Sequence, residues 1–145
     1  MSCYIDSSLL VKLYHPEDLS QEVTNLVEQL QTAILFSSLH ELEIKNAISL
    51  KVYRKEMQEK QAEQIVGDID SDISSGLLAR IHPEWSGVYR RALHISKNIT
   101  PATGSRTLDI LHIAIALEYG CHTFITHDNR QGKAAGITGL QVRFI

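Results

Sequence analysis

Short apolar runs alternate along the chain with longer segments in which apolar residues recur every three or four positions. The runs predict strands at residues 3–5, 34–36, 77–81, 123–126 and 141–144. The longer segments predict helices at residues 20–31, 38–55, 57–74, 85–97 and 107–119. Because strands alternate with helices, we expect an α/β fold in which helices flank a central parallel sheet.

Proline and glycine residues, which interrupt helices and strands, agree with these boundaries. Pro101 and Gly104 predict a loop over residues 100–104, and Gly120 closes the last helix. The helices at 38–55 and 57–74 follow one another almost directly, which predicts an antiparallel hairpin. The chain shows no internal repeat or linker, so we expect one domain over residues 1–145.

The composition is that of a globular protein. The chain has 145 residues, of which 43% are hydrophobic and 21% charged, which excludes a disordered chain or a disulfide scaffold. No apolar run reaches the roughly 18 to 20 residues that a membrane span needs, and the first residues do not resemble a secretory signal. We therefore expect a cytoplasmic protein with no membrane partner. Cys3 and Cys121 are expected to be buried thiols, not a disulfide.

Acidity is concentrated in one segment. Residues 56–72 hold six acids and one base, a net charge of −5, which leaves +2 for the rest of the chain. Three alternating aspartates in this segment resemble the start of a calcium loop, but that loop needs Gly and Glu where the chain has Ile73 and Ala79. We interpret the segment as a solvated helix face or a partner surface. The overall charge of −3 is therefore compatible with an RNA partner confined to one face.

Two further acids follow strands. Asp6 comes directly after residues 3–5, and Asp128 closes the run at 123–126. Ligands bind at the carboxyl ends of parallel strands, so both are candidate site residues. Each also has an ordinary explanation, because Asp6 suits the N-cap of a helix and Asp128 suits the start of a turn.

Another two acids interrupt apolar helix faces. Glu43 shares a stripe that we expect to face the sheet, while its neighbour Glu41 points to solvent; the stripe contains Leu39, Leu42, Asn46, Ala47 and Leu50. Asp109 and His112 lie three residues apart in a helix that is apolar almost all round. Structural roles also remain open for both acids, because Glu43 could lie at the edge of its stripe and Asp109 could complement the dipole at the start of a helix. His112 is expected to be a hydrogen-bonded core histidine.

The four acids together are more informative than any one of them. Carboxylates that converge in one cleft repel each other, and a divalent cation relieves that repulsion. Oxygen ligands favour Mg²⁺ or Mn²⁺, and the histidines and cysteines lack the spacing of a zinc site. The sequence also lacks the motifs of a serine hydrolase and of a phosphate-binding loop.

Four blocks, taken in order, resemble the PIN-domain ribonucleases and specifically the VapC-type toxins of toxin–antitoxin pairs. They are residues 4–14, 43–48, 106–114 and 126–130, the last followed by Ala134-Ala135 and Gly139-Leu140. The resemblance implies a PIN-like (Rossmann-like) three-layer sandwich with a parallel sheet of about five strands in the order 3-2-1-4-5. It also implies an acidic quartet of Asp6, Glu43, Asp109 and Asp128, with Ser8 and Thr126 as supporting hydroxyls.

The same resemblance implies a Mg²⁺- or Mn²⁺-dependent endoribonuclease, an RNA substrate, a cognate antitoxin that wraps the toxin, and a homodimer. The hairpin of central helices resembles the family's antitoxin-binding clamp. Candidate phosphate contacts near the cleft are Lys45, Arg106, Arg130 and Lys133. The alternatives are a catalytically silent PIN fold that binds a protein, and a PIN nuclease that acts on another nucleic acid.

Overall fold

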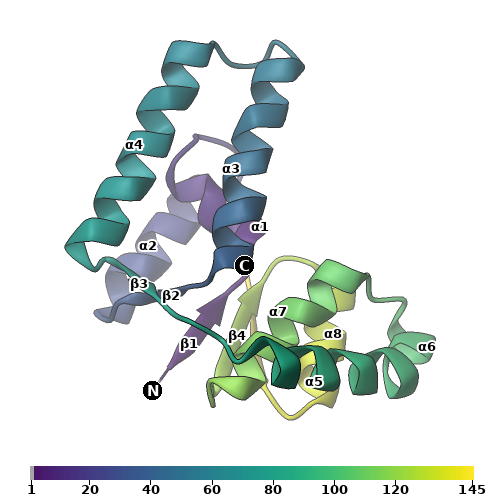
Figure 1. Ribbon diagram of the computed structural model, residues 1–145. Coiled ribbons are helices and arrows are strands. Elements are labelled where there is room, and N and C mark those ends of the chain that lie inside the picture. The colour runs from purple at the N-terminus through teal and green to yellow at the C-terminus, as the bar shows by residue number, and fades with distance from the viewer. Residues whose placement is uncertain (1) are drawn as a thin grey trace. The chain divides into compact units, whose positions relative to one another are not determined.

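The structure is a computed structural model, and it describes residues 2–145. Contacts within the chain group into two compact units. The first unit comprises residues 2–6 and 82–145, and the second comprises residues 7–81. Each unit is described by itself below (Figure 1).

The first unit is built on a three-stranded parallel sheet in the order β1-β4-β5. Its strands are β1 (Cys3–Ile5), β4 (Thr123–Thr126) and β5 (Gln141–Phe144). Its helices are α5 (Trp85–Asn98), α6 (Thr100–Thr103), α7 (Thr107–Glu118) and α8 (Asn129–Ile137). Helix α5 packs on α7, and α8 packs on β4 and β5.

The core of the first unit lies around the central strand. Tyr4 of β1 is aligned with Phe124 of β4, and their rings stack with centroids 5.5 Å apart. Helix α7 is buried continuously from Ile110 to Ala116, as expected for a helix that is apolar almost all round. Its N-terminal turn, which carries Asp109, is thereby fixed against the sheet.

The second unit contains a two-stranded parallel ladder of β2 (Ile34–Phe36) and β3 (Leu78–Arg80). Its helical segments are α1 (Ser7–Leu10), the short 3-10 helix η1 (Val11–Leu13), α2 (Ser20–Leu30), α3 (Ser38–Tyr53) and α4 (Glu59–Ser75). Helices α3 and α4 form the predicted hairpin (Figure 1). The side chain of Ser37 caps α3 by accepting a hydrogen bond from the backbone N–H of His40.

The predicted α/β class is confirmed, and all five predicted strands are present. The sheet differs in one respect: the strands form a ladder of three and a ladder of two, where one sheet of about five was expected. Two helical segments were not predicted: residues 100–103 form α6 where a loop was expected, and residues 129–137 form α8. The segment of α1 and η1 follows directly after Asp6, where a helix was one of the two interpretations.

The predicted buried stripe of α3 is wrong. The buried residues of this helix are His40, Ile44 and Ile48, whereas Leu42 is 67% exposed. Helix α3 packs against both α1 and α4, so its contacts do not follow the single stripe that the sequence suggested. Glu41, expected in solvent, is half-buried and paired with Arg80 and Lys45.

Among residues 2–145, no helix combines the length and apolar character that crossing a bilayer requires. Cys3 and Cys121 are free thiols, and burial raises the pKa of Cys121.

Candidate active site

Three of the four candidate acids belong to the first unit. Asp6 ends β1 and its backbone N–H donates to Ile125 O at 3.0 Å, which continues the ladder between β1 and β4. Asp128 follows β4, and Asp109 lies in the first turn of α7. Because β1 and β4 are parallel neighbours, their carboxyl ends meet at one edge of the sheet, as the sequence predicted.

Asp128 lies at the end of a strand and also has a structural role: where the sequence suggested the start of a turn, it caps the next helix. Its Oδ1 accepts a hydrogen bond from the backbone N–H of Gln131 at 3.0 Å, so it is the N-cap of α8. The backbone N–H of Asp128 donates to Thr126 Oγ1 at 3.0 Å. Thr126, predicted as a supporting hydroxyl, is fully buried and thereby fixes the start of the turn.

Gln131 is a polar residue of this site that the sequence analysis missed. Its side chain is fully buried, its Nε2 donates to Asp6 Oδ1 at 3.1 Å, and its Oε1 accepts from Thr126 Oγ1 at 2.7 Å. A signal was available, because Asp128 followed three residues later by Gln resembles the start of a capped helix. That signal predicts α8 and places Gln131 in its first turn.

Asp6 is nearly enclosed, with only 7% of its surface exposed. His112 Nε2 lies 3.9 Å from Asp6 Oδ1, and His112 Nδ1 is hydrogen-bonded to the hydroxyl of Tyr4 at 2.7 Å. His112 is therefore a hydrogen-bonded core histidine, as expected, and it also lies beside the strand-end acid.

The charges of Asp6 and Asp128 act on Asp109. Burial raises the pKa of Asp109, the hydrogen bond from the Arg106 backbone N–H lowers it, and the negative charges of Asp128 and Asp6 raise it further. The net result is a pKa above the ordinary value. A carboxylate held near two others out of water is stabilised by a cation.

Glu43 belongs to the second unit. Its Oε1 accepts a hydrogen bond from Ser7 Oγ at 3.1 Å. Ser7 is buried in α1, whereas its neighbour Ser8, predicted as a supporting hydroxyl, is exposed. Ser7 thus supplies a hydroxyl that contacts Glu43, and the supporting role of Ser8 stays a prediction.

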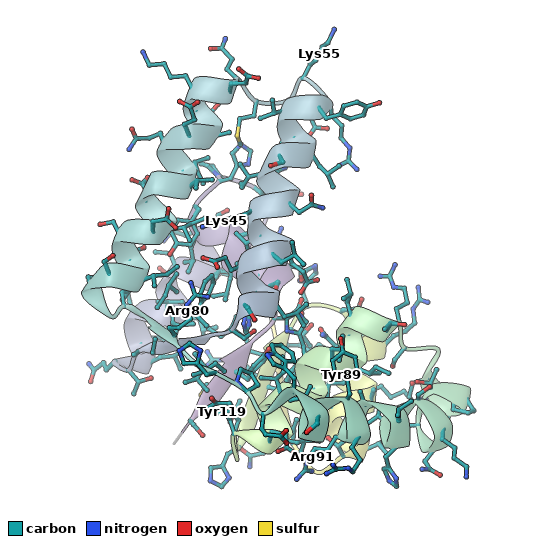
Figure 2. All side chains as sticks on the ribbon, viewed as in Figure 1. Lys45, Lys55, Arg80, Tyr89, Arg91 and Tyr119 are labelled. Atoms are coloured by element: carbon teal, nitrogen blue, oxygen red, sulfur yellow. The ribbon has the colours of Figure 1, made fainter. Side chains whose placement is uncertain are left out.

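The candidate phosphate contacts differ in how far their charge is already compensated. Lys45 donates to Glu41 at 3.2 Å and to Asp70 at 2.8 Å, and Arg80 completes this network on Glu41 at 2.9 Å (Figure 2). Arg106 is 74% exposed, with Nε 3.7 Å from Asp109 Oδ2. Arg130 and Lys133 lie exposed on α8, just beyond Asp128. Arg106 is thus close to an acid of the first unit, Arg130 and Lys133 follow Asp128 along α8, and Lys45 is committed to an ion-pair network.

The acidic segment at residues 56–72 is partly internal to the second unit. Asp70 holds Lys45, and Asp72 Oδ2 accepts a hydrogen bond from the Tyr14 hydroxyl at 2.7 Å. Burial raises the pKa of Tyr14, and the hydrogen bond and charge of Asp72 raise it further. The exposed acids of α4 remain available as a solvated face or a partner surface.

The chemistry of the donor set fits a hard divalent cation. The three acids of the first unit supply carboxylate oxygens only, and their mutual repulsion is the electrostatic condition that Mg²⁺ or Mn²⁺ relieves. Within residues 2–145, no three His, Cys, Asp or Glu side chains are close enough together to form a ready-made metal cluster. Asp6, Asp109 and Asp128 would therefore have to move closer together to hold such an ion, with water completing the coordination.

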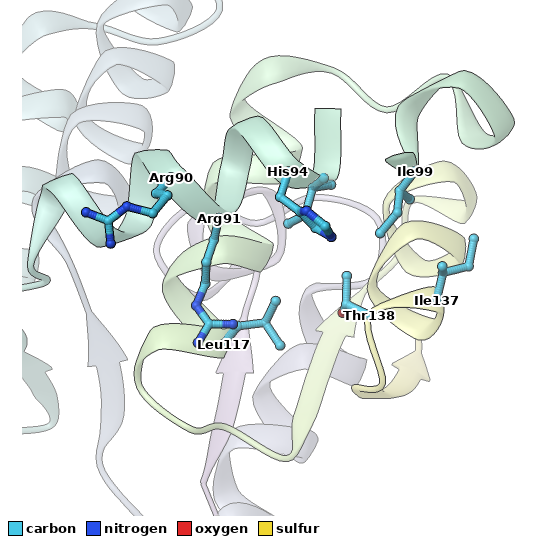
Figure 3. A pocket seen from close by; sticks show the side chains of 8 residues that line it. Arg90, Arg91, His94, Ile99, Leu117, Ile137 and Thr138 are labelled. Atoms are coloured by element: carbon cyan, nitrogen blue, oxygen red, sulfur yellow. The ribbon is translucent and has the colours of Figure 1, made fainter. Parts of the chain in front are cut away.

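A separate pocket of about 480 Å³ lies elsewhere in the first unit (Figure 3). It is lined by α5, by Leu117 at the end of α7, and by Ile137 at the end of α8. Asp109 and Asp128 lie at the opposite, N-terminal ends of these same two helices. Arg91, which lines the pocket, forms an ion pair with Glu118. The pocket is therefore distinct from the acidic site.

Comparisons with known proteins agree with the sequence blocks. A family model described as "PIN domain" matches residues 3–137. The crystal structure of FitAcB from Neisseria gonorrhoeae is similar, with a TM-score of 0.66 and 14% identity over 99% of this chain and 97% of that chain. VapBC2 from Rickettsia felis, bound to a DNA fragment from their promoter, has a TM-score of 0.69 and 16% identity over 100% of this chain and 99% of that chain. A search of curated proteins gave no significant match.

Proposed function

Because the chain belongs to the PIN-domain family, we propose that it is a metal-dependent endoribonuclease that acts as the toxin of a toxin–antitoxin pair in the cytoplasm. The observation that carries the proposal is the gathering of Asp6, Asp109 and Asp128 in the first unit, where the charges of two of them act on the third. Capping of α8 explains Asp128, but it does not explain why Asp109 is held where the charges of Asp128 and Asp6 raise its pKa.

Asp6, Asp109 and Asp128 are proposed to hold Mg²⁺ or Mn²⁺, and Glu43 is proposed as the fourth acid on the strength of the sequence resemblance. The bound ion supplies Lewis-acid polarisation of the phosphodiester and lowers the pKa of an attacking water. Thr126 fixes the turn that presents Asp128. Arg106, Arg130 and Lys133 are proposed to bind RNA phosphates around the acids and so orient the substrate.

The partner proteins are proposed on two grounds. The FitAcB and VapBC2 structures share this fold, and VapBC2 is described as bound to promoter DNA. Helix α4 exposes acids and α3 exposes the apolar residues Leu42 and Tyr53, which suit a basic and apolar partner segment. We therefore propose a cognate antitoxin and, following the sequence resemblance, a homodimer.

The test is RNA cleavage by the purified protein, with and without Mn²⁺ or Mg²⁺, beside an Asp6→Asn, Asp109→Asn variant. We expect cleavage of structured or unstructured RNA only by the native protein and only with metal. Equal cleavage by both proteins would contradict the metal-nuclease mechanism. If the native protein cleaves no RNA, a PIN fold that only binds a protein becomes the better explanation; cleavage of DNA alone would indicate a different nucleic-acid substrate.

The toxin role has its own test. Co-expression with the product of the neighbouring reading frame should yield a stable complex in which RNA cleavage is suppressed. A native protein that cleaves RNA but neither binds that product nor slows growth on induction would retain the nuclease proposal and lose the toxin proposal.

A further inference from the structure

Gln131 connects two of the three acids of the first unit. Its side-chain Nε2 donates to Asp6 Oδ1 at 3.1 Å, and its backbone N–H donates to Asp128 Oδ1 at 3.0 Å. Asp6 ends β1 and Asp128 follows β4, so one residue of α8 contacts the carboxylates of two different segments.

The direction of each hydrogen bond follows from the chemistry of the partners. An ionised carboxylate only accepts, so the NH₂ end of Gln131 faces Asp6 and the carbonyl end faces Thr126. The Thr126 hydroxyl then donates to Gln131 Oε1 at 2.7 Å and accepts from the Asp128 backbone N–H at 3.0 Å. The hydrogen bonds therefore run without a break from the Asp128 backbone N–H through Thr126 and Gln131 to Asp6.

Burial makes the loss of any of these hydrogen bonds costly in free energy. Gln131 and Thr126 are fully buried, and Asp6 is nearly so. A buried amide that loses a partner pays the full cost of desolvation, so the rotamers of Gln131 and Thr126 are locked together. Asp6 is therefore held in one orientation by a group that carries no charge and cannot compete with it for a cation.

We infer that Gln131 is a positioning residue, which orients the carboxylates of Asp6 and Asp128 toward a divalent cation without binding that cation itself. This inference rests on the proposed metal site. Groups that orient metal ligands in this way typically change metal affinity about 10- to 100-fold when they are removed.

The test measures Mn²⁺ binding directly, through the electron paramagnetic resonance signal of free Mn²⁺, and not through activity. Gln131→Met keeps the length of the side chain and removes its hydrogen bonds to Asp6 and Thr126, while the backbone N–H bond to Asp128 remains. The matched control is Thr103→Val, which removes a buried hydroxyl bonded to Ile99 O and Ser105 Oγ, outside the hydrogen bonds of Gln131. We expect the Kd for Mn²⁺ to be about 10- to 100-fold higher in Gln131→Met than in the native protein, and within about twofold of native in Thr103→Val.

Thr126→Val breaks the opposite end of the same chain. If Gln131 acts through this network, the Gln131→Met, Thr126→Val double variant should bind Mn²⁺ hardly more weakly than the poorer single variant. Additive losses would indicate two independent effects and would contradict the network.

A second measurement does not require metal or any variant at Gln131. In the native protein, the Gln131 side-chain NH₂ signals in a ¹⁵N–¹H spectrum should exchange slowly with water, and they should shift in Asp6→Asn. Unchanged signals in Asp6→Asn would overturn the inference, whether or not Gln131→Met folds.

The outcomes separate the two proposals. If native protein and Gln131→Met bind Mn²⁺ equally, the positioning role is wrong and the metal site stands. If the native protein binds no Mn²⁺ at millimolar concentration, the metal site is wrong. The NH₂ signals then decide whether Gln131 positions Asp6.

Discussion

Glu17 joins three segments of the second unit through two lysines. Its carboxylate accepts hydrogen bonds from Lys12 of η1 at 3.0 Å and from Lys51 of α3 at 2.8 Å. Burial alone raises the pKa of Glu17, but the hydrogen bonds and charges of Lys51 and Lys12 outweigh burial and lower the pKa to about 2. This residue therefore stabilises the folded state as an anion.

The pH dependence follows from that shift. The unfolded chain binds the proton near pH 4.5, whereas the folded chain resists it until about pH 2. The stabilisation is complete above about pH 4.5 and is lost as the pH falls toward 2. Glu17→Gln should lower the free energy of unfolding in urea by about 1 kcal/mol at pH 7 and by less at pH 3. The exposed Glu28→Gln should change it little at either pH, and an equal loss at both pH values for Glu17→Gln would contradict the ion-pair explanation.

The hydroxyl of Tyr4 is hydrogen-bonded to the buried His112. Tyr4→Phe removes the hydrogen bond to His112 Nδ1 and leaves a polar nitrogen without its partner among apolar neighbours. We expect the free energy of unfolding to fall by about 1–3 kcal/mol, measured by urea denaturation. Tyr119→Phe is the matched control, because its hydroxyl accepts from the His82 N–H at an exposed site. Similar losses for both variants would show that burial of the hydrogen bond is not what matters.

At the residue scale, the acids of the first unit could be predicted because a charge in an apolar segment is conspicuous in a sequence. Gln131 could not be singled out in the same way, since a neutral amide beside charged residues looks like ordinary surface. Glu41 was misplaced for a related reason: its partner Arg80 is 39 positions away, and no local pattern indicates that pair.

Helix α8 shows why one element escaped prediction. Its buried face consists of Gln131 and the small residues Gly132, Ala134 and Ala135, so it carries little of the apolar periodicity used to recognise helices. These small residues allow the helix to lie close to β5. The long, strongly periodic helices were predicted correctly because their side chains, not their backbones, make the contacts.

The two glycines of α8 give a matched test of this packing. A Cβ at Gly132 would meet the ring of Phe144, whereas a Cβ at Gly136 would lie 3.8 Å from Val142 Cγ2, an ordinary contact. Alanine favours a helix over glycine by roughly 0.5–1 kcal/mol, so Gly136→Ala should stabilise the protein by about that amount. Gly132→Ala should lose this gain, because the Phe144 ring must move. Equal stabilisation in thermal unfolding would show that α8 and β5 are not closely packed.

At the scale of the whole chain, the family and the α/β class could be predicted because they rest on the order of elements and on four motif blocks. The division of the strands into ladders of three and two could not, since apolar runs indicate strands but not which neighbours they pair with. The quartet is likewise divided between the units, with three acids in the first and Glu43 in the second. The sequence predicts these acids as a set, and their function as a set is best tested on the intact chain.

Ionised Asp109 should favour metal binding but lower the stability of the metal-free protein. Its pKa is raised by burial and by the charges of Asp128 and Asp6, so the ionised carboxylate destabilises the metal-free fold at neutral pH. Asp109→Asn should therefore raise the Tm of the metal-free protein, and this gain should shrink as the pH falls and the native carboxyl takes up its proton. With Mn²⁺ at 100 times its Kd, the native protein should gain about 2.7 kcal/mol. For a chain of this length that gain corresponds to a rise in Tm of about 5–10 °C.

The variant should show no such rise, because it lacks one of the three carboxylates that attract the cation. Asp18→Asn, at an exposed position of the second unit, is the control and should respond to Mn²⁺ as the native protein does. A variant that is less stable than native without metal would show that Asp109 stabilises α7 as an ordinary first-turn acid. A variant that still gains stability from Mn²⁺ would place the cation elsewhere. Only higher stability without metal together with loss of the Mn²⁺ response matches a carboxylate that is held at a cost to the fold in order to bind a cation.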